Sequence, residues 1–132
     1  AREGTDVSVI GYGRPVRDAM VLAEKLAAEG ISVEVVDLRT VSPLDTETVL
    51  KSVAKTGRAV VIHEAPRSFG CGAEIAARIQ ESLYSELKAP VLRVASRDVT
   101  VPFSRVLEAA YLYQASGIEA AIRQTLEKRA AR

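Results

Sequence analysis

The sequence predicts an α/β fold, a three-layer sandwich in which a mainly parallel sheet of about five strands carries helices on both faces. Short runs rich in β-branched residues alternate with helical patterns along the 132 residues, as in a chain of strand–helix–strand units. The runs are nearly continuous in apolar character, which is typical of strands buried on both faces. Parallel strands joined by helices imply right-handed crossovers.

The first strand is predicted over residues 7–12 and is followed by a helix over 14–29. Apolar residues recur in that helix at helical spacing, and Gly30 is placed to end it. The second strand covers 32–38, and the next helix follows the sequence SPLD. Asp45 in that sequence is a good N-cap residue.

The second helix is predicted to end at Gly57, before a third strand over 59–63. A third helix follows, with Ile75, Ile79 and Leu83 on one face. The fourth strand is predicted over 90–95.

The least regular part of the sequence is 98–113, where Pro102 indicates a loop. We expect a short extra strand there, which would bring the sheet to about five, and a helical turn over 106–110. The last helix opens with a capping-box pattern, Ser116 with Glu119.

Composition indicates a single globular domain, residues 1–132, and excludes several classes of function. The formal net charge of +1 argues against a nucleic-acid-binding surface, and no apolar run approaches the length of a membrane span. One cysteine and one histidine are too few for the usual zinc sites. The lone cysteine and the lack of a signal peptide predict an intracellular protein, cytoplasmic if bacterial and in the mitochondrial matrix if eukaryotic.

Ligands of such sheets gather at the carboxyl ends of the strands, where the first candidate is GYGRPV after the first strand. It resembles a dinucleotide fingerprint, but the third glycine position is Val16, and Pro15 removes an amide donor. A tight strand–helix turn explains the glycines better. After the second strand, Asp37 and Arg39 are expected to form an ion pair, and a functional Arg39 would hold a carboxylate or phosphate.

The stretch VVIHEAPRSFGCGAEIAARI, residues 60–79, concentrates the only histidine and the only cysteine. A nucleophile at Cys71 with His63 as its base would need the two side chains within hydrogen-bond reach. Alternation along the strand sends His63 and Glu64 to opposite sides, so they are a poor acid–base pair. The alternative is structural: Gly70 and Gly72 let the backbone turn tightly into a helix, and Cys71 packs as a small residue.

Four segments also match one family in order: TDVSVIGYG, EVVDLRTVSPLD, KTGRAVVIHEAPRSFGCGAEIAARIQE and APVLRVASRDVTVPFSRVLE. The chain resembles the C-terminal, transketolase-like domain of the β subunit of 2-oxo acid dehydrogenase E1 components. The HEAP sequence resembles the branched-chain type of the enzyme more than the pyruvate type.

The resemblance implies an enzyme of E1 α and β subunits that uses thiamine diphosphate and Mg²⁺ to decarboxylate a 2-oxo acid and acylate the lipoyl group of E2. In this family the cofactors lie between the α subunit and the N-terminal domain of β. The chain is therefore expected to be a fragment without activity of its own, lacking residues that bind thiamine diphosphate or metal. The alternative from another class is an independent small enzyme that uses Cys71 and His63.

The resemblance also implies partners for this domain: the E1 α subunit, a second β subunit and the subunit-binding domain of E2. Interface candidates are Arg39, His63, Glu64, Arg67, Glu86 and Lys88. In the family, an acidic residue commonly precedes the AP of the fourth strand, and here Lys88 reverses its charge. A basic C-terminal tail of Lys128, Arg129 and Arg132 accompanies this reversal.

Overall fold

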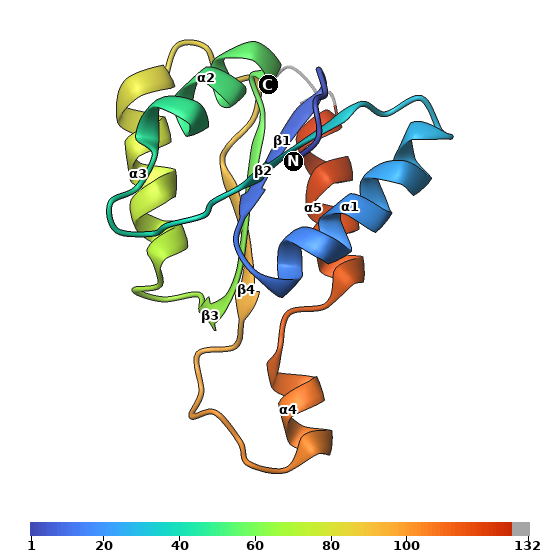
Figure 1. Ribbon diagram of the computed structural model, residues 1–132, viewed down its shortest axis with the longest axis vertical. Coiled ribbons are helices and arrows are strands. Elements are labelled where there is room, and N and C mark those ends of the chain that lie inside the picture. Colours follow the sequence, from blue (N-terminus) through green and yellow to red (C-terminus); the bar gives the residue numbers. More distant parts are fainter. Residues whose placement is uncertain (128–132) are drawn as a thin grey trace.

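Four parallel strands form the sheet, in the spatial order β2-β1-β3-β4 (Figure 1). The computed structural model describes residues 1–127, so the predicted basic tail of Lys128, Arg129 and Arg132 lies outside the described residues. The elements are β1 (Val7–Gly11), α1 (Arg14–Ala27), β2 (Val33–Asp37), α2 (Thr46–Thr56), β3 (Ala59–Pro66), α3 (Cys71–Leu83), β4 (Leu92–Ser96), α4 (Arg105–Tyr111) and α5 (Ala115–Leu126).

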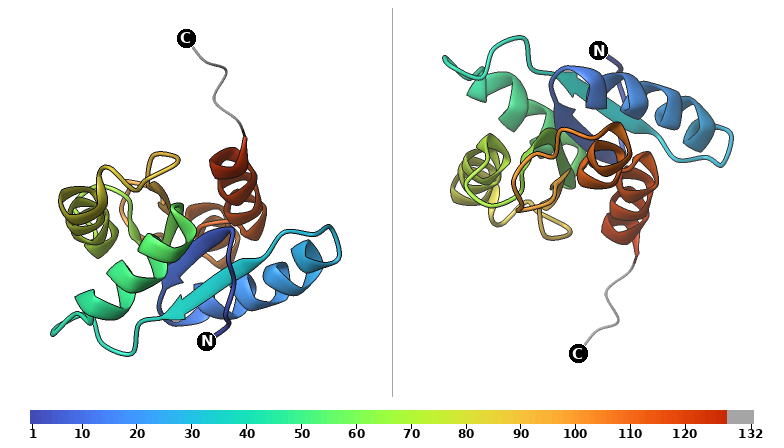
Figure 2. Two further views of the ribbon diagram at one scale, coloured as in Figure 1. Left: turned by 90° about the horizontal axis from the view of Figure 1, so that it is seen from above. Right: turned by 90° about the horizontal axis from the view of Figure 1, so that it is seen from below.

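Helices cover both faces of the sheet, which confirms the predicted three layers. α2 and α3 lie on one face and α1 and α5 on the other (Figures 1 and 2). Alternate strand residues supply the two cores: Val9 packs with α1 and α5, and Ile10 packs with α2 and α3. All five residues of β1 are buried, as its continuous apolar sequence predicts.

The sheet has four strands among residues 1–127, so the expected extra strand in 98–113 was wrong. The chain leaves the sheet after Ser96, and the Asp98 carboxylate then accepts two hydrogen bonds from Ser68 of the β3–α3 loop, from its backbone N–H at 2.8 Å and from its hydroxyl at 2.7 Å. The helical turn predicted in this region is confirmed as α4. An additional pairing occurs at the β2 edge, where Arg2 forms an antiparallel bridge with Val35.

Local signals account for most helix ends. Asp45 caps α2 by accepting a hydrogen bond from the Thr48 N–H at 3.0 Å, and Gly57 follows that helix in the left-handed conformation with φ of 71°. The predicted capping box in α5 was wrong, since Gln114 is the N-cap residue and no side chain caps the helix. The carboxylate of Glu119 instead pairs with Arg123 and Lys25, charged partners that outcompete a backbone N–H.

A buried polar cluster joins β1 to α2 inside one core. The Ser8 hydroxyl lies 2.7 Å from the hydroxyl of Ser52 and 2.8 Å from that of Thr56. Each hydroxyl therefore has a partner away from water, and the cluster fixes the position of α2 on the sheet. Among the described residues, no helix is both long and apolar enough to span a membrane.

Candidate functional site

The loops after all four strands meet at the carboxyl edge of the sheet, the lower edge in Figure 1. The loop after β3 begins later than expected, because β3 continues to Pro66. Its pairing with β4 shifts between Ile62 and Pro66, which is a bulge in the strand. The sequence predicted that His63 lies at the tip of the strand. In the structure it lies within β3.

The imidazole of His63 is completely enclosed, with 0% of the residue exposed. Its Nδ1 lies 3.0 Å from the carbonyl oxygen of Ala65, so Nδ1 carries the proton and donates it. Nε2 has no hydrogen-bond partner among the described residues. The ring of Tyr12 is stacked on the imidazole, with centroids 6.4 Å apart and planes at 11°.

Two glycines beside Cys71 make room for this imidazole. A methyl group at Gly72 would lie 2.4 Å from His63 Nε2. One at Gly70 would lie 2.4 Å from the Pro66 carbonyl oxygen and 2.8 Å from His63 Cε1. Gly70 itself has φ of −73°, an angle that any residue adopts. The predicted tight turn agrees with Gly70, whose nearest neighbour is the Pro66 backbone of the same loop, whereas Gly72 is required by the close approach of His63.

Cys71 is the first residue of α3 and is half-buried. Its thiol donates to the Tyr12 hydroxyl oxygen at 3.4 Å and makes no hydrogen bond to His63, whose Nε2 lacks a partner. Burial, followed by the contact with Cys71, raises the pKa of Tyr12 to about 12. The structure therefore does not join Cys71 and His63 as a nucleophile and its base.

Burial lowers the pKa of His63 below its usual 6.5; the bond to Ala65 opposes this shift and the charge of Arg93 adds to it. Unfolding releases the ring to its ordinary pKa, so below pH 6.5 the unfolded chain binds the proton first. We expect the contribution of His63 to the free energy of unfolding to be complete above pH 6.5 and to decline as the pH falls further. The slope is at most about 1.4 kcal/mol per pH unit.

Urea titrations of wild type and His63→Gln between pH 5 and 8 measure this effect, since most carboxylates titrate below that window. The stability difference between the two proteins should be level above pH 6.5 and change in the variant's favour below it. A difference that moves in favour of wild type on acidification would show that the folded state binds the protonated ring more tightly.

Asp37 and Arg39 form the predicted ion pair at the end of β2, with Arg39 Nη1 3.4 Å from Asp37 Oδ2. The Arg39 side chain is 88% exposed, so the pair contributes little to stability. The turn after β1 also agrees with the structural interpretation: Gly13 precedes α1, and Pro15 lies in its first turn.

The β3–α3 loop is held to the chain that leaves β4. Glu64 is half-buried, while Arg67 is exposed. The Arg67 N–H donates to the Ser96 carbonyl at 3.1 Å, and its own carbonyl accepts from Arg93 Nη1 at 2.9 Å. With the Ser68–Asp98 bonds, these contacts join two strand ends, and the sequence gives no sign of this pairing.

Glu86 and Lys88 lie at the opposite edge of the sheet, in the connection from α3 to β4. The ammonium group of Lys88 donates to the Thr56 carbonyl at 3.2 Å, at the C-terminal end of α2. A cation at this position interacts favourably with the helix dipole. Lys88 thus has a structural role that the sequence reasoning missed, and Glu86 beside it is exposed.

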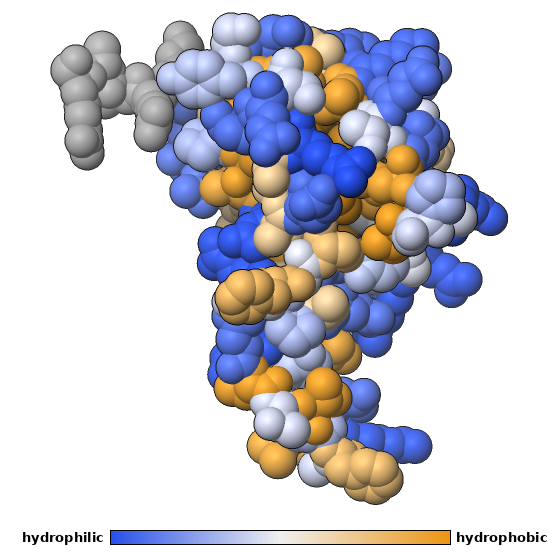
Figure 3. All heavy atoms as spheres, turned by 90° about the vertical axis from the view of Figure 1, so that its left-hand side faces the viewer, coloured by the Kyte–Doolittle hydropathy of each residue, from blue (hydrophilic) through white to orange (hydrophobic). Residues whose placement is uncertain are grey.

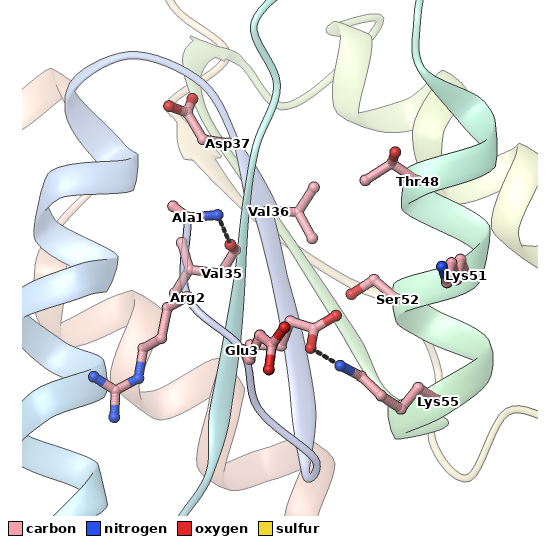
Figure 4. A pocket seen from close by; sticks show the side chains of 11 residues that line it. Ala1, Arg2, Glu3, Val35, Val36, Asp37, Thr48, Lys51, Ser52 and Lys55 are labelled. Atoms are coloured by element: carbon pink, nitrogen blue, oxygen red, sulfur yellow. Dashed lines mark hydrogen bonds and ion pairs between the residues drawn. The ribbon is translucent and has the colours of Figure 1, made fainter.

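An open groove of about 470 Å³ runs between the β2 edge and α2 (Figure 4). Glu34 on the groove pairs with Lys55, and the N-terminal amine of Ala1 donates to the Val35 carbonyl at 2.8 Å. The charged groups of Glu34, Lys55 and Ala1 are thus paired within the protein, and none of the three is left to bind a ligand. Within residues 1–127, no cluster of His, Cys, Asp and Glu could hold a metal ion.

The sequence of the chain is similar to a known protein family and to several known proteins. The family model described as "Transketolase, C-terminal domain" matches residues 1–118. The chain is 47% identical over 126 residues to the pyruvate dehydrogenase E1 component subunit beta of Bacillus subtilis, covering 96% of this chain and 38% of that protein. The corresponding protein of Staphylococcus aureus is 45% identical, with the same coverage. The chain thus spans well under half the length of these relatives.

Two solved structures share the fold. A split-gene transketolase, described as an inactive β4 tetramer, superposes with a TM-score of 0.81 at 30% identity, over 98% of this chain and 41% of that chain. The 2-oxoglutarate:ferredoxin oxidoreductase of Magnetococcus marinus superposes with a TM-score of 0.59 at 14% identity, over 96% of this chain and 19% of that chain. The second likeness concerns the fold alone.

Proposed function

Because the chain belongs to the transketolase C-terminal domain family, we propose that it is the assembly domain of the β subunit of a thiamine-dependent 2-oxo acid dehydrogenase E1. The supporting observation is the 47% identity with a pyruvate dehydrogenase subunit beta across nearly the whole chain. The buried His63 supports the same view, because a fully enclosed imidazole cannot reach a substrate.

Pyruvate is the substrate that the relatives favour. The expectation of a branched-chain enzyme rested on HEAP, and the similar proteins described above are pyruvate dehydrogenase subunits instead. The structure explains why HEAP is a poor guide to the substrate. His63 occupies a closed space against Gly70 and Gly72, so the motif reflects packing.

The cofactors of this proposal belong to other parts of the enzyme. The described residues offer no ligand cluster for Mg²⁺, and Pro15 interrupts the amides at the start of α1. They do not fit thiamine diphosphate with its metal, so other parts of the enzyme would hold these cofactors. The solved relative described as an inactive tetramer of β chains agrees with a β chain that needs a complement.

Decarboxylation assays with the full-length β subunit and its α subunit test the proposal. We expect CO₂ release only when both subunits are present, with kcat/KM for pyruvate at least about tenfold above that for branched-chain 2-oxo acids. Preference for the branched-chain acids would restore the substrate type predicted from HEAP. No turnover of any 2-oxo acid by the assembled subunits would refute the proposed function.

Docking of E2 near Glu86 and Lys88 is a further part of the proposal, together with contacts to the α subunit and a second β subunit. If Lys88 meets a carboxylate of E2, Lys88→Glu should weaken E2 binding by about tenfold at low salt and by less at high salt. Lys88→Gln is the matched control, because it also loses the bond to Thr56 without adding negative charge. Equal E2 affinity for all three proteins at both salt concentrations would exclude this contact.

A further inference from the structure

Five of the nine exposed large hydrophobic side chains of the described residues lie on one projection at the carboxyl edge, which we call the arm (residues 97–111). Phe103 and Val106 on the arm are 106% and 79% exposed, and Phe69 of the neighbouring loop is 104% exposed. Val99, Val101 and Leu107 complete the group. The arm extends away from the sandwich (Figure 1), and hydrophobic residues gather at its tip (Figure 3).

The arm is fixed at its base and free at its tip. Asp98 holds it to Ser68, and the Arg97 N–H donates to the Tyr111 carbonyl at 3.2 Å, which closes the loop on itself. In α4, Tyr111 is buried and the six residues before it are exposed. A short helix in which only the last residue is buried receives little stabilisation from packing against its own domain. Such a contiguous apolar surface is typical of a protein contact.

The charges around the arm select the kind of partner. Three arginines, Arg67, Arg97 and Arg105, are exposed at its rim and outnumber the two exposed carboxylates, Glu108 and Asp98, of which Asp98 already accepts from Ser68. Two copies of the arm placed face to face would bring these arginines together, and like charges at an interface are unfavourable. The surface therefore fits a partner with an apolar centre and an acidic rim better than it fits a second copy.

The direction of the chain at Ala1 indicates where such a partner lies. Arg2 pairs antiparallel with Val35, so a polypeptide joined to the amine of Ala1 would continue toward the carboxyl end of β2. That end is the edge from which the arm projects (Figure 1).

The part of the relatives that lies outside the match is large enough to reach the arm. The arm leaves β4, at the far side of the sheet from β2, and four strands span only about 14 Å. About 200 residues of the Bacillus subtilis relative lie outside the match, and a domain of that size has a radius of gyration of about 16 Å.

We propose that the arm and Phe69 form the surface on which the domain preceding Ala1 in the full-length subunit docks, through an apolar patch rimmed by carboxylates. This inference rests on the proposed function, since it takes the order of domains from the E1 β subunits. It assigns to the carboxyl edge of the sheet a contact within one chain.

Hydroxyl-radical footprinting of the full-length β subunit, alone and dilute enough to be monomeric, tests the proposal. Phe69 and Phe103 should be labelled at least about fivefold more slowly than Tyr84, which is 76% exposed at the end of α3 and serves as internal reference. The variant Val106→Asp/Leu107→Asp should restore fast labelling of Phe69. The matched control Val21→Asp, at a position 70% exposed on α1, should leave it slow.

Three other labelling results would overturn the docking proposal. Protection that appears only after the α subunit is added would make that subunit the occupant, and protection that depends on β concentration would make it a second copy. Fast labelling in all samples would leave the arm uncovered. Labelling requires neither substrate nor cofactor, so a protected arm in a β subunit whose assembly with α turns over no 2-oxo acid would refute the proposed function and leave the docking surface intact.

Discussion

Gly72→Ala is expected to destabilise the protein by about 3 kcal/mol, because the added methyl group would lie 2.4 Å from Nε2 of the buried His63. The imidazole has little room to move aside, because its Nδ1 is bonded to the Ala65 carbonyl and its ring is stacked on Tyr12. Thermal or urea unfolding of the purified variant measures the loss.

A double-mutant cycle identifies the cause. His63→Ala removes the atoms that the new methyl group would meet, so Gly72→Ala should cost much less in that background, with a coupling energy of about 2 kcal/mol. Gly117→Ala is the control, since a methyl group at this α5 position would lie 3.5 Å from its nearest neighbour, an ordinary contact. We expect Gly117→Ala to stabilise the protein slightly, as alanine does in helices. Additive losses in the cycle would show that the glycine serves the helix and not the histidine.

Gly11→Ala is expected to cost at least as much, about 3 kcal/mol or more, and to resist rescue. A methyl group at Gly11 would lie 2.4 Å from Ile62 Cγ1 and 2.6 Å from the Ile62 backbone oxygen, on the adjacent strand. Ile62→Ala removes the first contact and leaves the second. The coupling energy in this pair should therefore be less than half that of Gly72 with His63, measured by the same unfolding titrations. Full rescue by Ile62→Ala would show that the backbone of β3 can move aside.

These two glycines show where sequence reasoning succeeds and where it stops. Local signals predicted the strands and helix ends, because Asp45 and Gly57 act on their own backbone or on residues three or four positions away. Gly11 was interpreted as part of a turn and Gly72 as part of a helix start. Their main constraint is a close neighbour from another element, which no local pattern contains.

The sequence predicted that His63 and Cys71 lie near the carboxyl edge of the sheet, but it did not predict their contacts. His63 lies within β3, and Cys71 begins α3. The stacking of Tyr12 on His63 and its bond with Cys71, a residue 59 positions away, depend on strand order. The hydrogen bonds between Ser68 and Asp98, 30 positions apart, likewise join two loops that no local pattern connects.

In the proposed function, this domain supports assembly of the enzyme and supplies no reacting group. Steady-state decarboxylation by the assembled α and β subunits carrying Cys71→Ala tests it most directly, since Cys71 is the one thiol of this chain and is half-buried at the start of α3. We expect kcat to stay within about twofold of wild type, because the thiol donates to the Tyr12 hydroxyl and is not joined to His63. A loss of about a thousandfold or more, in an assembly of unchanged size and stability, would show that Cys71 takes part in the reaction and would contradict the claim.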